Sequence, residues 1–346
     1  MRRLTILLVL VAAASCGGDG ASHDERVSMA EIQVLGTHNS YRQKVPDELF
    51  EALAAFDADL AASLDYEHPP ITEQLERLGA RQLELDVFAD PEGGLFATRH
   101  INPTFGLPAE AEGLDEPGWK VLHVQEIDYA SSCPTFVGCL TEVRDWSLAN
   151  DGHLPLLVLV EVKDDEIPDP LGVGFVTPVQ VDARLLADLD AEIRSVFDDE
   201  HLIRPGIEAW PSLADARGKV VFALDNTNDV RDAYRTLDDP AMFTDGDGLF
   251  RKLNDPIGDA GAIREAVAAG QVVRTRADAD TVQARTGDTA MSDAALASGA
   301  QYVSTDYLEP DERFSDYAVR LPGGAVARCN PVATNEACDL DELERR

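Results

Sequence analysis

Basic residues are scarce in this sequence. The chain of 346 residues has 29 Lys and Arg against 64 Asp and Glu, and the resulting formal net charge of −35 is spread over its whole length. A surface this acidic repels phosphate backbones, so we exclude nucleic acid as a partner. The charge is compatible with cation binding, but an acidic, solvated surface that keeps the protein soluble accounts for nearly all of it.

Long hydrophobic runs are also few. Residues 4–14 form such a run after Met1-Arg2-Arg3, but it is too short for a membrane-spanning helix and has the pattern of a secretory signal. The run ends in Ala13-Ala14-Ser15-Cys16, which resembles a lipoprotein signal in which Cys16 becomes the acylated first residue. Because Ala13 stands where leucine is usual, secretion by plain cleavage stays an alternative.

These features predict three segments and export from the cytoplasm. Residues 1–16 are the signal, residues 17–28 are a flexible tether rich in Gly, Ser and Asp, and residues 29–346 are the folded domain. The mature protein is then a cell-envelope lipoprotein or a secreted protein.

Cysteines are few, and they could form disulfides or, as the alternative, a zinc site. Neither CxxC spacing nor a nearby histidine marks a zinc site. Apart from Cys16 there are four, which allow three connectivities. An exported chain can oxidise them. On proximity in the sequence we predict the disulfides Cys133–Cys139 and Cys329–Cys338.

Internal repeats, low-complexity segments and linkers are absent from the sequence, and the 45% apolar content can fill a large core. The length allows one large domain or two small ones. We predict helices over residues 47–66, 71–78, 136–150, 181–197 and 280–298, with Phe50 and Phe56 of the first packed in the core. Strands are expected from residue 32 and over 81–88, 95–100, 119–124, 154–163, 219–225, 271–275 and 302–307, with a less regular stretch at 241–244. Strands that alternate with helices predict a parallel sheet, and eight candidates from Ile32 fit a single (β/α)8 TIM-type barrel, regular or irregular in detail.

The strand over residues 81–88 carries two acidic residues on one face. Leu83, Leu85 and Val87 alternate with Glu84 and Asp86, and strands of such a barrel are buried on both faces. Buried carboxylates cost several kcal/mol unless they are paired or bound to a cation. The pattern therefore predicts a metal site.

A turn at residues 90–94 is followed by the expected strand over 95–100. A hairpin between this strand and residues 81–88 would bring His100 back toward Asp86. The alternative is a loop histidine without a partner.

Polar residues also follow the other predicted strands. They are His38 and Asn39, His123, Glu161 and Lys163, Asp225, Arg274 and Arg276, and Asp306 and Tyr307. In a barrel the carboxyl ends of all strands face one mouth, where the chemistry takes place. Carboxylate and amide oxygens favour calcium or magnesium, and histidines supply an acid and a base near neutral pH. This combination is typical of phosphoester cleavage.

Taken together, these motifs resemble the phosphoinositide-specific phospholipases C, and most of all their bacterial calcium-dependent branch. The resemblance is carried by residues 36–41 (GTHNSY), by Glu84-Leu85-Asp86 followed by His100, and by Glu161 after an apolar strand. It extends over nearly all of the mature chain, including residues 127–129, 273–278 and 304–307.

The resemblance implies a Ca²⁺-dependent barrel enzyme. It implies that Asn39, Glu84, Asp86 and Glu161 are the calcium ligands, and that His38 and His100 are the catalytic histidines, with His123 as the competitor of His100. In the chemistry of that family, the inositol 2-hydroxyl attacks the phosphodiester and releases diacylglycerol and a cyclic inositol phosphate. His100 would protonate the departing glycerol oxygen, and Glu84 or Asp86 is a candidate base.

The expected partner is a phospholipid at a membrane surface, reached through the lipid anchor or through loops, and we expect a monomer. Further candidates for binding phosphate or the inositol ring are Lys163, Arg274, Arg276 and Tyr307. Two alternatives stay open. One is a metal-dependent glycerophosphodiester phosphodiesterase, and the other is a non-catalytic, cation-binding surface lipoprotein.

Overall fold

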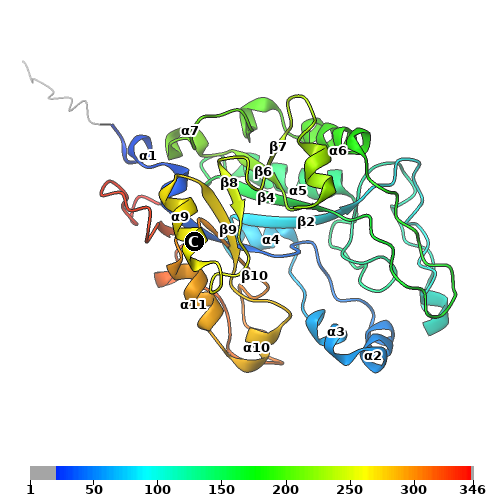
Figure 1. The fold of residues 1–346 in the computed structure, drawn as a ribbon. Helices are drawn as coiled ribbons and strands as arrows, with labels where there is room; N and C mark the ends of the chain where they lie inside the picture. The colour runs from blue at the N-terminus through cyan, green and yellow to red at the C-terminus, as the bar shows by residue number, and fades with distance from the viewer. Residues whose placement is uncertain (1–20, 344–346) are drawn as a thin grey trace, which may run out of the picture.

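The fold was obtained as a computed structural model that describes residues 21–343 (Figure 1). The predicted signal and Cys16 lie outside the described residues. The described chain is a curled, mostly parallel sheet with helices packed around it, which confirms the predicted TIM-type architecture.

Eight parallel strands form the wall of the barrel. They are β1 (Ile32–Thr37), β2 (Gln82–Phe88), β4 (Leu156–Val162), β6 (Val220–Leu224), β7 (Met242–Thr244), β8 (Phe250–Lys252), β9 (Val272–Arg276) and β10 (Tyr302–Thr305). Hydrogen bonds join them in the order β7-β6-β4-β2-β1-β10-β9-β8. Among residues 21–343 no such ladder joins β7 to β8, so the wall is open at this seam.

Three short strands lie on this wall. Two are antiparallel to their neighbours: β3 (Lys120–Val121) pairs with β2, and β11 (Ala327–Cys329) pairs with β1. The third, β5 (Leu202–Ile203), is parallel to β6.

Helices connect the strands and cover the outside of the wall (Figure 1). They are α1 (His23–Arg26), α2 (Asp47–Phe56), α3 (Ala58–Ser63), α4 (Ile71–Glu76), α5 (Phe136–Ala149), α6 (Ala183–Val196), α7 (Leu213–Ala216), α8 (Asp229–Tyr234), α9 (Ala260–Ala268), α10 (Val282–Thr286) and α11 (Ala290–Ala297). Short 3-10 turns are η1 (Met29–Glu31), η2 (Asn102–Phe105), η3 (Asp199–His201) and η4 (Pro322–Gly324).

Two helices predicted as continuous are each broken into two. The helix expected over residues 47–66 ends at Phe56, and the Asp57 side chain then caps α3 by accepting a hydrogen bond from the backbone N–H of Leu60. The helix expected over residues 280–298 is interrupted at Gly287, whose φ of +69° ends α10. A local cap overrides the longer apolar periodicity in the first case, and a left-handed glycine does so in the second.

The core placement predicted for Phe56 is wrong. Its side chain is 76% exposed at the end of α2, whereas Phe50 is partly buried. Figure 1 shows α2 and α3 standing out from the body of the barrel on the same side as α10.

The two faces of each strand serve different cores. The outward face of β2, with Leu83, Leu85 and Val87, packs against α5 and α6. The inward face of the wall is apolar at its lower end, toward the amino-terminal ends of the strands, where Leu157 and Leu159 of β4 meet apolar residues of six other strands of the wall. Since side chains alternate along a strand, Glu84 and Asp86 point inward, as do the residues at the upper ends of the neighbouring strands.

Gly36 is the reason that β1 and β2 can approach each other. It lies opposite Gln82, and a Cβ atom at this position would stand 2.3 Å from the Cβ of Gln82. Only glycine fits here. The first residue of the GTHNSY segment is therefore structural.

The predicted hairpin over residues 81–100 is wrong. Residues 95–100 form no strand, and β3 occupies the antiparallel position beside β2 instead, with Val121 opposite Val87. The intervening segment folds around its own small core, in which Phe88 and Phe96 lie side by side. The strand expected over residues 119–124 is reduced to Lys120–Val121.

The ends of the described chain are tied to the barrel. Within the segment predicted as a tether, α1 forms one helical turn and Val27 is completely buried. The predicted disulfides Cys133–Cys139 and Cys329–Cys338 are both confirmed, and the second joins β11 to the C-terminal segment. Of the helices in the described part of the chain, none has the length and apolar character needed to cross a membrane.

Candidate active site

A layer of charged side chains lies in the barrel interior above the apolar layer, toward the carboxyl ends of the strands, which form the upper end of the barrel. Each comes from the carboxyl end of a strand, where parallel barrels hold their chemistry. The layer consists of His38 after β1, Glu84 and Asp86 on β2, Glu161 and Lys163 at the end of β4, Asp225 after β6, Lys252 on β8, Arg274 and Arg276 on β9, and Asp306 after β10.

Acidic groups of this layer converge on one point. Glu84, Glu161 and Asp225 each present a ligand atom within 4.8 Å of the others. Asp86 lies opposite Glu161 in the register between β2 and β4. Asp225 belongs to this cluster although the sequence had indicated it only as a strand-end residue.

Three cationic side chains offset part of this charge. The Arg274 guanidinium pairs with Glu84, the Lys163 ammonium lies 2.8 Å from Glu161 and 3.4 Å from Asp86, and Lys252 lies 2.6 Å from Asp225. Lys163 and Arg274, both predicted as site residues, therefore contact predicted metal ligands directly.

Several oxygen atoms of the site are buried without a hydrogen bond. They are Oδ1 of Asn39, both carboxylate oxygens of Asp86 and Oδ1 of Asp225. Buried polar atoms without a partner cost free energy unless a ligand satisfies them. These are hard oxygen donors from three strand ends, which fit Ca²⁺.

Burial and neighbouring charges shift the pKa values of these carboxyl groups. Burial raises the pKa of Glu84 to about 7, with Asp225 and Glu161 adding to the shift and Arg274 opposing it. Burial also holds the pKa of Asp86 well above its usual value, against the effect of Lys163. A divalent cation would relieve both shifts because it favours the ionised carboxylates.

His38 lies between two carboxylates, those of Asp306 and Glu84. Its Nδ1 lies 2.9 Å from Oδ1 of Asp306, and its Nε2 lies 3.7 Å from Oε1 of Glu84. Burial and the nearby Arg276 lower the pKa of His38 to about 3, so the ring is neutral. With Nδ1–H donating to Asp306, Nε2 is the unprotonated nitrogen, and it faces Glu84.

Arg276 and Asp278 support the His38–Asp306 pair. Arg276 lies 3.3 Å from the second carboxylate oxygen of Asp306 and 3.5 Å from Nε2 of His38. Asp278 is fully buried and accepts hydrogen bonds from the backbone N–H of Asp306, from Thr305 and from the hydroxyl of Tyr317. Burial, with the charge of Asp306, raises the pKa of Asp278 to about 7.

Asn39 follows His38 in a left-handed backbone conformation, with φ of +46°. This conformation turns its side chain out of the alternation of β1, and its Nδ2 donates to the hydroxyl of Tyr66 over 3.1 Å. Tyr66 contacts both His38 and Asn39, but no motif in the sequence marked it.

The structure treats the two candidates for the second histidine differently. His123 lies 2.7 Å from Asp128, whose carboxylate is also held by the buried Arg42. His100 is exposed in the loop before η2. Of these two histidines, only His123 has a carboxylate that orients its ring within residues 21–343.

Tyr307 lies away from the charged layer. Its ring packs edge-on against Tyr317 at 5.9 Å between centroids, within an apolar cluster outside the wall. Asp306 points inward, so the side chain of the next residue points outward.

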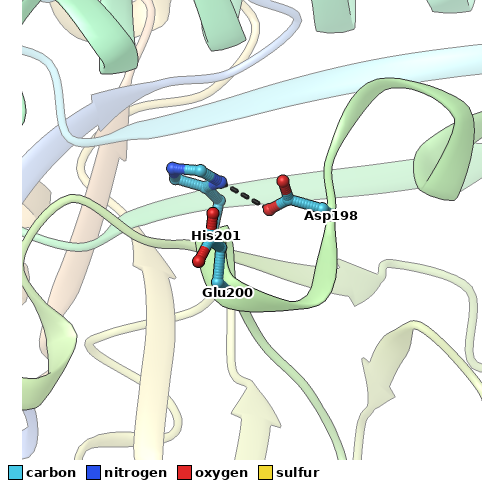
Figure 2. Close-up of side chains that lie close together, drawn as sticks. All are labelled: Asp198, Glu200 and His201. Carbon is cyan, nitrogen blue, oxygen red and sulfur yellow. Dashed lines mark hydrogen bonds and ion pairs between the residues drawn. The ribbon is translucent and has the colours of Figure 1, made fainter.

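A second group of possible ligands lies near the amino-terminal end of β5. Figure 2 shows Asp198, Glu200 and His201 gathered on the turn η3, where the His201 ring lies 2.5 Å from Asp198. Asp198 and Glu200 are exposed, and η3 leads into the start of β5, whose register matches the start of β6. This group is therefore remote from the charged layer at the carboxyl ends.

The chain was compared with protein families and with solved structures. Residues 27–331 match the family of Ca²⁺-dependent phosphoinositide phospholipases C. Among solved structures, a calcium-dependent phosphoinositol-specific phospholipase C from Pseudomonas sp. is 15% identical, with 89% of this chain and 97% of that chain covered and a TM-score of 0.50. A Ca²⁺-dependent enzyme from Streptomyces antibioticus is 17% identical, with 82% and 95% covered and a TM-score of 0.47.

No curated protein matches the sequence. At 15% identity the Pseudomonas structure supports the fold alone. The family match extends over most of the chain and includes every strand of the wall. The chain belongs to the family of Ca²⁺-dependent phosphoinositide phospholipases C.

Proposed function

We propose that the charged layer is the active site of a Ca²⁺-dependent phosphodiesterase that cleaves phosphatidylinositol-type lipids into diacylglycerol and a cyclic or linear inositol phosphate. The observation that carries this proposal is the set of buried oxygens without hydrogen bonds, on Asn39, Asp86 and Asp225, beside a histidine whose Nε2 faces the same cluster. Asn39, Glu84, Asp86, Glu161 and Asp225 would hold the cation. When bound, Ca²⁺ supplies acidity to the attacking hydroxyl and offsets charge on the phosphoryl oxygens.

The residues of this chain supply the proton transfers and the positive charge. The inositol 2-hydroxyl loses its proton as its oxygen attacks phosphorus, and the carboxylate of Glu84, which lies 3.7 Å from Nε2 of His38, is the candidate to accept it. His38 Nε2 lies beside Glu84 and relays or stabilises this proton. Arg276 and Lys163 carry the charge that a phosphoryl group requires.

The bond to the glycerol oxygen then breaks, and this oxygen needs a proton. A second histidine supplies it, for which His123 and His100 are the two candidates. Asp128 orients the ring of His123 in the way that carboxylates orient catalytic histidines elsewhere. This contact favours His123 over His100.

Release of water-soluble inositol phosphate from labelled phosphatidylinositol vesicles tests the proposed function. With Ca²⁺ we expect inositol phosphate and diacylglycerol in equal amounts. Chelation should reduce turnover by at least about 100-fold, because a catalytic metal contributes several kcal/mol to the transition state. A turnover rate that is unchanged by the chelator would contradict the proposal. Release of glycerol phosphate from a deacylated diester would also contradict it.

Membrane contact through loops has support in exposed apolar side chains near the mouth. Phe56 is 76% exposed and Leu60 is 38% exposed, on the helices that follow β1. Val282 is 52% exposed on α10, which follows β9. These segments leave the carboxyl ends of their strands, so a bilayer that covers them would face the site.

Replacing Phe56 by serine should weaken binding to phosphatidylinositol vesicles about 10-fold, because burying a phenylalanine is worth about 1.5–3 kcal/mol. Co-sedimentation with vesicles measures this. Hydrolysis of a soluble inositol phosphodiester should stay unchanged. Leu148→Ser is the matched control, since Leu148 is 53% exposed near the end of α5 that leads back to the lower end of β4. Equal loss of binding in both variants would exclude a specific role for Phe56.

Export of the protein is supported by its two disulfides, because such bonds persist in oxidising compartments. Acylation of Cys16, the resulting lipid anchor and the monomeric state remain predictions from the sequence.

A further inference from the structure

Tyr66 lies between the two parts of the proposed active site. It belongs to the loop between α3 and α4, and only 4% of its surface is exposed. Its hydroxyl oxygen lies 3.1 Å from Nδ2 of Asn39 and 3.2 Å from Nδ1 of His38. One oxygen atom thus contacts a proposed calcium ligand and the proposed catalytic histidine.

The contact with Asn39 determines how its carboxamide is turned. The NH₂ group donates to the tyrosine oxygen, so the carboxamide oxygen is directed elsewhere, and this is the atom that is buried without a partner. A carboxamide offers a cation only its oxygen. The hydrogen bond to Tyr66 therefore holds the amide in the orientation that a cation needs.

Tyr66 is itself held from several sides. The Arg42 guanidinium lies 4.4 Å from the centre of its ring and also donates to its backbone carbonyl. The His68 ring packs edge-on against it at 5.7 Å, and His68 Nε2 lies 2.8 Å from the backbone carbonyl of His38. Arg42 is in turn paired with Asp128, the partner of His123. These contacts hold the ring and the backbone of Tyr66 through residues other than Asn39.

We propose that Tyr66 is a positioning residue that directs the carboxamide oxygen of Asn39 toward the calcium site while it buttresses the ring of His38. This inference rests on the proposed function, because it requires Asn39 to bind Ca²⁺. Tyr66 touches neither the cation nor the reacting atoms in this role. Outer groups that orient a metal ligand typically change metal affinity 10–100-fold when they are removed.

Tyr66→Phe removes the hydroxyl and keeps the ring, its packing and the contact with Arg42. Calorimetric titration of the substrate-free protein with CaCl₂ should give a Kd about 10-fold higher than that of the wild type. The matched control is Tyr302→Phe. Tyr302 is equally buried, and its hydroxyl lies 3.3 Å from the backbone carbonyl of Pro155 at the lower end of the barrel. Its Kd should equal that of the wild type.

Repeating the Tyr66→Phe substitution in an Asn39→Asp variant distinguishes orientation of the amide from a general structural effect. Asn39→Asp keeps an oxygen ligand but has two equivalent oxygens and no NH₂ group, so Tyr66 has no amide to orient. In this background Tyr66→Phe should change the Kd for Ca²⁺ by less than about twofold. An equal loss of affinity in both backgrounds would overturn the role proposed for Tyr66, and so would an unchanged Kd in the single variant.

The same titrations distinguish this inference from the proposed function. A wild-type protein that takes up no Ca²⁺ would refute the calcium site itself. Binding by the wild type together with unchanged binding by Tyr66→Phe would refute only the role of Tyr66.

Discussion

Replacing His38 by asparagine is expected to reduce turnover of phosphatidylinositol by about 10²–10⁴-fold, the range for loss of a general acid or base. Asparagine can keep the hydrogen bond to Asp306 that Nδ1 of the histidine makes, but it has no counterpart of Nε2, the nitrogen 3.7 Å from Glu84. The loss should appear in kcat, because the proton transfer takes place after the substrate is bound.

Calorimetric titration with CaCl₂ provides the control for this variant, and the Kd should stay within a few-fold of the wild-type value. Turnover within tenfold of the wild type would contradict the role of His38. The same assay applied to His123→Ala and His100→Ala identifies the second histidine. The variant that lacks the general acid should have a lower kcat and a pH profile without its alkaline limb. The other variant should keep the kcat and the pH profile of the wild type.

Replacing Asp86 by asparagine is expected to abolish the response to Ca²⁺ and to stabilise the calcium-free protein. Both oxygens of Asp86 are buried without hydrogen bonds, and Glu84 and Glu161 crowd the same site. Asparagine removes a charged form that burial disfavours most of all and that Glu161 and Glu84 also repel. The variant gives up the 3.4 Å ion pair with Lys163, which keeps its contact with Glu161. Activity at saturating Ca²⁺ should fall at least about 100-fold, as expected for loss of a metal worth several kcal/mol.

Thermal unfolding measures the stability part of this prediction. In chelator the melting temperature of Asp86→Asn should lie about 1–2 °C above that of the wild type, which corresponds to roughly 1 kcal/mol for a chain of this length. Added CaCl₂ should raise the wild-type melting temperature and leave that of the variant unchanged. Asp198→Asn, in the exposed group of Figure 2, is the control and should behave as the wild type in both assays. A calcium response in Asp86→Asn would refute its role as a ligand.

The alternation of side chains made much of this site predictable. Glu84 and Asp86 alternate with leucines on β2, and Glu161 continues the inward face of β4, so their convergence follows from strand period and register. The same rule places the side chain of Tyr307 outside the wall, next to the inward Asp306. The local sequence of β2 and β4 was thus sufficient to predict that they are strands and which of their side chains point inward.

Other parts of the site depend on contacts that no local pattern encodes. Asp306 reaches His38 from the far end of the chain, and Tyr66 reaches Asn39 from an irregular loop. The hairpin was mispredicted because the loop after β2 buries Phe88 and Phe96 against each other instead of extending along the strand. Packing within the loop outweighed the turn signal in its sequence.

The pairing of β1 has a consequence for how the protein folds. Besides one contact with β2 at Gly36, β1 pairs along its length with β10 and β11, where Val34 lies opposite Tyr302 and Ile32 lies opposite Cys329. Contacts between such distant parts of a chain require closure of a very long loop and form late. The segment that carries His38 and Asn39 is synthesised before β10 and β11 and pairs with them only after they have left the ribosome. Catalytic competence has to await the C-terminal strands, so truncated or incompletely synthesised chains would remain inactive.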